Sequence, residues 1–166
     1  MNATDLDHVG RIIEQWGEQR PDLDVSPMGL IGRLHRLAAR LHEELRPVFA
    51  EAGLGDGDFD VLAALRRSAP EHGLTPGELG TTTMVTSGAI TKRIDRLERA
   101  GLVTRTVSDT DARSRQVALT TKGRRLVDDL LERHVANEHR LVSGLSATDR
   151  DQLGRLLEAW GRALDA

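Results

Sequence analysis

Cysteine is absent from this sequence of 166 residues, so thiol-based redox sensing is excluded. The sequence also lacks an apolar run long enough to span a bilayer and a charged-then-apolar leader at its amino terminus. It contains no nucleophile elbow, phosphate-binding loop or paired-carboxylate motif. We therefore expect a cytoplasmic protein that is not an enzyme and that uses no cofactor.

The six histidines do not follow a metal-binding pattern. His134 and His139 are five residues apart and His35 and His42 are seven apart, with no helix-face carboxylate motif joining them. We expect ordinary surface or interface histidines and no metal site.

Positive charge is concentrated in one part of the chain. Between Thr91 and Arg125 there are ten Lys or Arg and four Asp or Glu, so this segment carries +6, while the whole chain carries −3. Taken alone, these charges would be explained by a solvated basic helix face. An acidic body with one strongly basic segment is also typical of proteins that bind phosphates on a single surface.

A short capped helix is predicted directly after Thr75. Thr75 suits an N-cap, Pro76 suits the first helical position, and Glu78 stands three residues after the cap, as in a capping box. The two side chains can then satisfy two backbone amides at the start of the helix.

A second helix is predicted from Thr86 or Ser87 to about Ala100, with Gly101 closing it in a left-handed cap. Its apolar face holds Ile90, Ile94 and Leu97. Its polar face holds Ser87, Thr91, Lys92, Asp95, Arg96 and Arg99. A hairpin follows, with alternating strands at Val103–Val107 and Gln116–Leu119 and a charged tip between them. This order of elements predicts a winged helix-turn-helix, which places its second helix in the major groove of DNA.

Helices with apolar stripes flank this segment. They are expected over Leu6–Trp16, from Ser26 to about Gly53, over Phe59–Arg67, over Leu126–Leu145 and over Leu153–Leu164. The terminal helices carry more apolar surface than a small winged-helix core can cover, so mutual burial across a two-fold axis is the economical solution. We therefore predict a mainly α fold with a small β-wing, with dimerisation helices at both ends of the chain. The expected parts are residues 1–52, the DNA-binding domain 53–120, and residues 121–166.

With these elements in place, the chain resembles the MarR family of bacterial transcription regulators. The resemblance rests on Leu74-Thr75-Pro76-Gly77-Glu78-Leu79, on Asp111-Ala112-Arg113-Ser114 in the wing, and on Leu119-Thr120-Thr121-Lys122-Gly123. It implies a homodimeric regulator, usually a repressor, that binds a pseudo-palindromic operator and is released by a small ligand. It also implies that Arg113 enters the minor groove. The other residues expected to contact DNA are Thr86, Ser87, Thr91, Lys92, Arg96 and Arg115.

The chain is still more similar to the urate-responsive, PecS-type branch of that family. The branch's ligand residues match Trp16, Asp60, Arg93 and Arg105 here. Arg93 completes the apolar stripe of its helix and Asp60 lies in an otherwise apolar helix, so each needs an opposite charge or a bound ion. The Trp16 ring offers a flat surface on which a heterocycle can stack. We expect a small anionic effector, urate or a similar metabolite.

Four alternatives stay open at this stage. Trp16 is equally well explained as a core residue, and Asp60 with an arginine as a plain buried salt bridge. The effector is also explained by a different aromatic or polycarboxylate compound. From a different class, an architectural DNA-binding protein would need no ligand.

Overall fold

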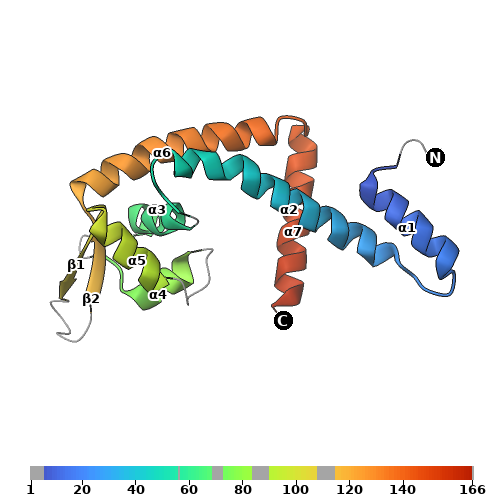
Figure 1. Cartoon of the computed structure of the whole chain (residues 1–166), viewed down its shortest axis with the longest axis horizontal. Coiled ribbons are helices and arrows are strands. Elements are labelled where there is room, and N and C mark those ends of the chain that lie inside the picture. Colours follow the sequence, from blue (N-terminus) through green and yellow to red (C-terminus); the bar gives the residue numbers. More distant parts are fainter. Residues whose placement is uncertain (1–5, 56, 69–72, 84–89, 108–114, 166) are drawn as a thin grey trace. The chain divides into compact units, whose positions relative to one another are not determined.

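A computed structural model describes residues 6–55, 57–68, 73–83, 90–107 and 115–165. Within these ranges the chain forms seven helices and one two-stranded antiparallel sheet (Figure 1), which confirms the mainly α fold with a small β-wing. The chain divides into two compact units, residues 1–44 and residues 45–166. No helix in the described part of the chain is both long and apolar enough to cross a membrane.

The first unit contains α1 (His8–Gln19) and most of α2 (Ser26–Ala50). Both helices were predicted from their apolar stripes, and α2 ends three residues before the expected Gly53. Asp7 caps α1, because its carboxylate accepts a hydrogen bond of 2.7 Å from the Gly10 amide.

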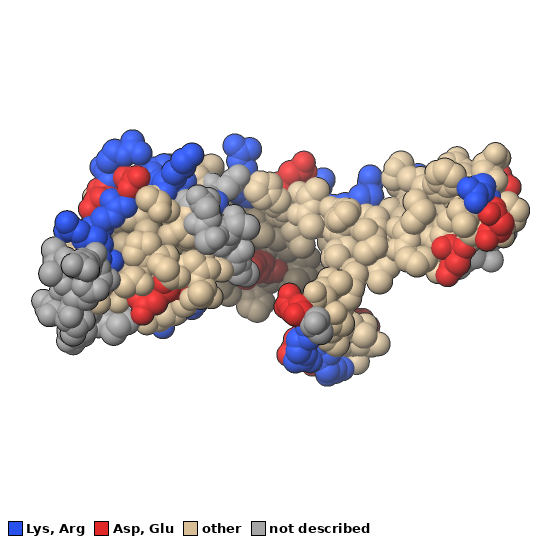
Figure 2. Space-filling model, turned by 90° about the horizontal axis from the view of Figure 1, so that it is seen from below, with Lys and Arg blue, Asp and Glu red and all other residues tan. Residues whose placement is uncertain are grey.

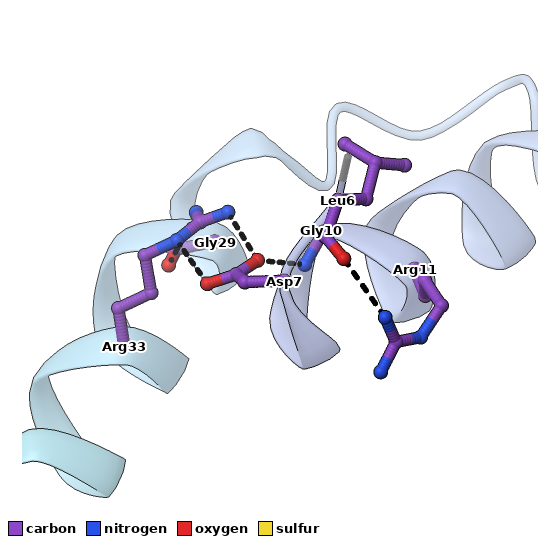
Figure 3. Close-up of polar contacts among 6 residues, drawn as sticks. All are labelled: Leu6, Asp7, Gly10, Arg11, Gly29 and Arg33. Atoms are coloured by element: carbon purple, nitrogen blue, oxygen red, sulfur yellow. Dashed lines mark hydrogen bonds and ion pairs between the residues drawn. The ribbon is translucent and has the colours of Figure 1, made fainter. Parts of the chain in front are cut away.

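Polar and apolar contacts hold α1 on α2 within this unit. The Arg33 guanidinium donates to both carboxylate oxygens of Asp7, at 2.9 and 2.8 Å (Figure 3). Gly32 allows close approach, since a Cβ added there would lie 3.2 Å from a methyl carbon of Val9. A polar clamp and a small-residue contact thus fix the helix that bears Trp16.

The second unit begins with the winged helix-turn-helix. Its elements are α3 (Asp58–Ser68), α4 (Pro76–Thr82), α5 (Ile90–Arg99), β1 (Val103–Val107) and β2 (Arg115–Leu119). The capping box of Thr75 and Glu78 is present, and Gly101 ends α5 with a φ of +69°, as predicted. The predicted start of the second helix lies outside the described residues.

The core of this unit joins α3 to the rest. Val61, Leu62 and Leu65 of α3 are almost completely buried, which agrees with an apolar helix in a central position. They share one cluster with the stripe of α5 and with Val117 of β2. Helix α5, the predicted DNA-reading helix, therefore rests on a packed core rather than on a loop.

Two long helices complete the unit, α6 (Thr121–Leu141) and α7 (Ala147–Leu164). The side chains of Thr120 and Ser146 cap their amino ends. Val127 and Leu130 of α6 join the core, whereas α7 has no buried residue.

Candidate DNA interface and effector site

The recognition helix α5 separates its residues by face. Ile90, Ile94 and Leu97 are at most 2% exposed and point into the core. Thr91 and Lys92, two of the expected DNA contacts, are exposed on the first turn of the helix. The amino-terminal residues of a recognition helix are those that reach base edges, so this turn is placed to read DNA.

Of the other expected DNA contacts, the structure describes Arg115, on the hairpin, and Arg96, in α5. Arg115 is exposed at the start of β2. Thr86, Ser87 and Arg113 lie outside the described residues.

Arg96 has an internal partner that the sequence did not suggest. Its guanidinium donates to both carboxylate oxygens of Asp58, at 2.8 and 2.6 Å. Asp58 is 1% exposed and also accepts a hydrogen bond of 2.7 Å from the Gly55 amide. The hydrogen bond with Asp58 raises the pKa of the Arg96 guanidinium. Asp58 lies in the first turn of α3 and binds Arg96 of the recognition helix.

Arg93 points toward the start of α3, as its place in the apolar stripe predicts. A Cβ added to Gly57 would lie 2.7 Å from Nε of Arg93, and the φ of +74° at this position also favours glycine. Asp60 is partly buried in the first turn of α3, and α3 packs against α5. Arg93 and Asp60 therefore belong to two helices that contact each other.

Arg105 joins the wing to the recognition helix. From β1 its guanidinium donates to Glu98 at 2.6 Å and to Asp95 at 2.5 Å, and both carboxylates belong to α5. The hydrogen bond with Asp95 raises the pKa of Arg105. Arg93 thus extends from the recognition helix, and Arg105 contacts that helix from β1.

Trp16 belongs to the first unit and is not a core residue of the single chain, because 44% of it is exposed. Its ring is therefore available to a ligand or to another chain. The relation of Trp16 to the other three expected ligand residues stays a prediction.

A third connection leads from the recognition helix to α6. Thr120 donates its amide and its hydroxyl to the Leu102 carbonyl at 3.0 and 3.2 Å, and Lys122 donates to the Ala100 carbonyl at 2.9 Å. A Cβ added to Gly123 would lie only 1.9 Å from the Leu102 oxygen. The end of α5 and the start of α6 therefore form one tight corner.

Positive side chains gather at this end of the second unit, near α5, the hairpin and the start of α6 (Figure 2). Exposed members are Lys92, Arg96, Arg99, Arg115, Lys122, Arg124 and Arg125. The basic segment seen in the sequence is thus a surface in the fold. Among the described residues, no cluster of His, Asp or Glu has the arrangement of a metal site.

The profile described as the MarR family matches residues 52–114. The transcriptional regulator PecS of Dickeya dadantii is 37% identical over 149 residues, which cover 90% of each chain. The structure of CouR from Rhodococcus jostii bound to p-coumaroyl-CoA is 28% identical with a TM-score of 0.66, over 78% of this chain and 90% of CouR.

The complex of S. aureus MepR with DNA has the same fold. It has a TM-score of 0.71 at 20% identity, over 85% of this chain and 98% of MepR. The matched relatives are named as transcriptional regulators and not as enzymes, in agreement with the motifs. Sequence, fold and relatives agree, and the chain belongs to the MarR family of transcriptional regulators.

Proposed function

We propose that this protein is a homodimeric repressor that a small anionic ligand, urate or a similar metabolite, releases from a pseudo-palindromic operator. The observation that carries the proposal is Arg105, whose guanidinium is shared by two carboxylates of the recognition helix. An anion that binds Arg105 competes with Asp95 and Glu98. Ligand binding is thereby converted into a force on α5.

We propose that the DNA-binding surface is the basic end of the domain formed by residues 53–120. The proposed contacts are Thr86, Ser87, Thr91, Lys92, Arg113 and Arg115. Arg96 is left out of this set, because both of its hydrogen bonds to Asp58 point it back to α3. Two copies of α5 related by a two-fold axis would meet half-sites about 10 bp apart.

The proposed effector site consists of Trp16, Asp60, Arg93 and Arg105. Two arginines suit an anion, and the exposed Trp16 ring suits a planar heterocycle. PecS is 37% identical to this chain over 149 residues, which supports a ligand of the same branch. A regulator of this kind would work in the cytoplasm, where its operator lies.

Exposed apolar side chains support the proposed dimer. They lie on α2, α6 and α7 and include Leu30, Leu37, Leu131, Val135, Leu153, Leu156 and Leu157. A single chain rarely leaves so many large apolar groups in water. We propose that residues 1–52 and 121–166 bury them against a second copy.

The test is a titration of the complex between the protein and its operator DNA. Urate should release the DNA and quench Trp16 fluorescence, with a coupling of about 1–3 kcal/mol between the two sites. Trp160→Phe leaves Trp16 as the sole tryptophan reporter, and Trp16→Phe and Arg105→Ala should blunt the release. Arg105→Ala is first checked for retained DNA affinity.

A second ligand class is favoured by CouR, whose structure holds an aromatic acyl-CoA. If calorimetry detects no urate binding at millimolar concentration, the same titration is run with aromatic and polycarboxylate anions. DNA release by none of these compounds would indicate an architectural DNA-binding protein instead.

A further inference from the structure

Asp58 is the one buried charged residue among those described, and it pairs with Arg96. The Asp58 carboxylate is 1% exposed, and one amide and two guanidinium nitrogens surround it within 2.8 Å. A buried carboxylate is costly unless its hydrogen bonds are made, so this geometry is strongly preferred over any other position of Arg96. The bidentate fork fixes both the direction and the rotation of the guanidinium.

The loop before α3 is shaped to admit this side chain. A Cβ added to Gly55 would lie 3.1 Å from Arg96 and 3.2 Å from Asp58, which is closer than side chains normally approach. Glycine at position 55 therefore lets the two charged groups meet against the backbone.

The position of Arg96 along α5 points the same way. Base contacts come from the first residues of a recognition helix, whereas Arg96 lies in the last turn of α5. The helix has its apolar stripe on one face and the Arg96 clamp beside it. Apolar packing alone would allow α5 to slide or roll on the core, whereas the bidentate ion pair with Asp58 of α3 fixes its orientation.

We propose that Asp58 is a positioning residue for DNA recognition, which acts through Arg96 to set the orientation of α5 without touching DNA. Arg96 is then a strut between α5 and α3 and contributes no phosphate contact, although its positively charged side chain is 48% exposed on the DNA-reading helix. This inference rests on the proposed DNA surface of α5.

The variants that test it are Arg96→Lys, Arg96→Gln and Asp58→Asn, with Lys92→Gln as the matched control for a phosphate contact. Affinity is measured against a duplex that the wild-type protein selects from a random library and against a scrambled duplex of equal length. Each titration is repeated at several salt concentrations, below the unfolding temperature of every variant.

If Arg96 is a strut, Arg96→Lys keeps the charge but loses the fork. It should then lower affinity for the selected duplex by about ten-fold or more, the effect of losing a base contact. Binding to the scrambled duplex and the salt dependence should not change, because no phosphate contact is lost. Loss of folded protein would instead weaken binding to both duplexes equally.

The control should behave differently, since Lys92→Gln is expected to weaken binding to both duplexes and reduce the salt slope by about one. Asp58→Asn and Arg96→Gln should match Arg96→Lys in specificity, and combining them should add little. If Asp58→Asn does not fold, Arg96→Lys decides alone.

Two outcomes overturn the proposal. Unchanged affinity in Arg96→Lys, with a salt slope reduced in Arg96→Gln, would make Arg96 a phosphate contact and Asp58 a structural residue only. A wild-type protein that selects no duplex would overturn the proposed function and this inference with it.

Discussion

The recognition helix α5 and the last helix α7 carry apolar stripes of the same kind, but only the stripe of α5 is covered within one chain. Its three large apolar residues are at most 2% exposed. On α7, Leu153, Leu156 and Leu157 are 41%, 60% and 44% exposed. Apolar surface leaves water wherever a matching surface exists, so α5 has its complement inside the chain, and the α7 stripe is the surface that we propose a second copy covers.

The helices α5 and α7 also differ in where their polar side chains find partners. Arg96 of α5 is bonded to α3, and Asp95 and Glu98 are bonded to the wing. On α7 the side chains make local hydrogen bonds, such as that from Arg162 to Glu158 one turn away. Among the described residues, these polar side chains of α5 therefore have their partners within the chain, whereas the apolar stripe of α7 stays exposed.

The largest effect is expected when α7 is removed. A chain ending at Ser143 should lose the proposed dimer entirely and become monomeric or aggregate, because its exposed apolar partner surface on α6 stays uncovered. Light scattering coupled to size-exclusion chromatography measures the mass, and footprinting shows how many half-sites are protected. A soluble truncated dimer with two protected half-sites would remove α7 from the interface.

A pair of leucine truncations sharpens the comparison. Leu97→Ala should lower the free energy of unfolding by about 2–5 kcal/mol, since it leaves a cavity beneath α5. Leu156→Ala should instead raise the dissociation constant of the dimer. Denaturant unfolding and sedimentation equilibrium separate these two quantities. The comparison fails if Leu156→Ala leaves the dimer unchanged.

The features that could be predicted from the sequence are those that neighbouring residues determine. Thr75 and Glu78 are three residues apart, and their capping box forms within a single turn. Gly101 ends α5 because the left-handed conformation favours glycine. The inward direction of Arg93 followed from helical periodicity alone.

The contacts between distant segments could not be predicted in this way. Asp58 and Arg96 are 38 residues apart, and either one alone fits a helix cap or a DNA contact. Their pairing depends on how α3 packs on α5, which no local pattern encodes. The one sequence signal for this pairing is the pair of glycines before α3, Gly55 and Gly57. A residue without a side chain leaves room for a long side chain to approach the backbone.

Glycine substitutions extend the comparison to smaller effects. Gly123→Ala should destabilise the fold by about 1–3 kcal/mol, because the new Cβ would press on the Leu102 carbonyl at the corner between α5 and α6. Gly154→Ala on α7 meets nothing within 4 Å and should stabilise the helix by about 0.5–1 kcal/mol. Thermal unfolding measures both. A weaker dimer in Gly154→Ala would place that position inside the interface.

The smallest effect concerns the clamp between α1 and α2. The hydrogen bond from Arg33, helped by the Gly10 amide, lowers the pKa of Asp7 below its ordinary value (Figure 3). A carboxyl group with a lowered folded-state pKa stabilises the fold above its unfolded-state pKa, near 4, and this contribution is lost as the pH falls through the folded-state value. Docking of α1 should therefore be complete at neutral pH and weaken in acid.

Trp16 reports this docking, because α1 carries it and Trp160 can be replaced by Phe. The Trp160→Phe protein serves as the parent, and Asp7→Asn is added to it. The Asp7→Asn variant should show a partly undocked signal already at pH 7, and raising the salt concentration should move the parent toward the same signal. Acid should change the Trp16 fluorescence of the parent more than that of Asp7→Asn, since other carboxyl groups titrate equally in both proteins. Parallel pH curves in the two proteins would show that Asp7 does not hold α1. The first unit would then depend on apolar packing between α1 and α2, such as that of Val9 on Gly32 and of Ile13 beside Gly29.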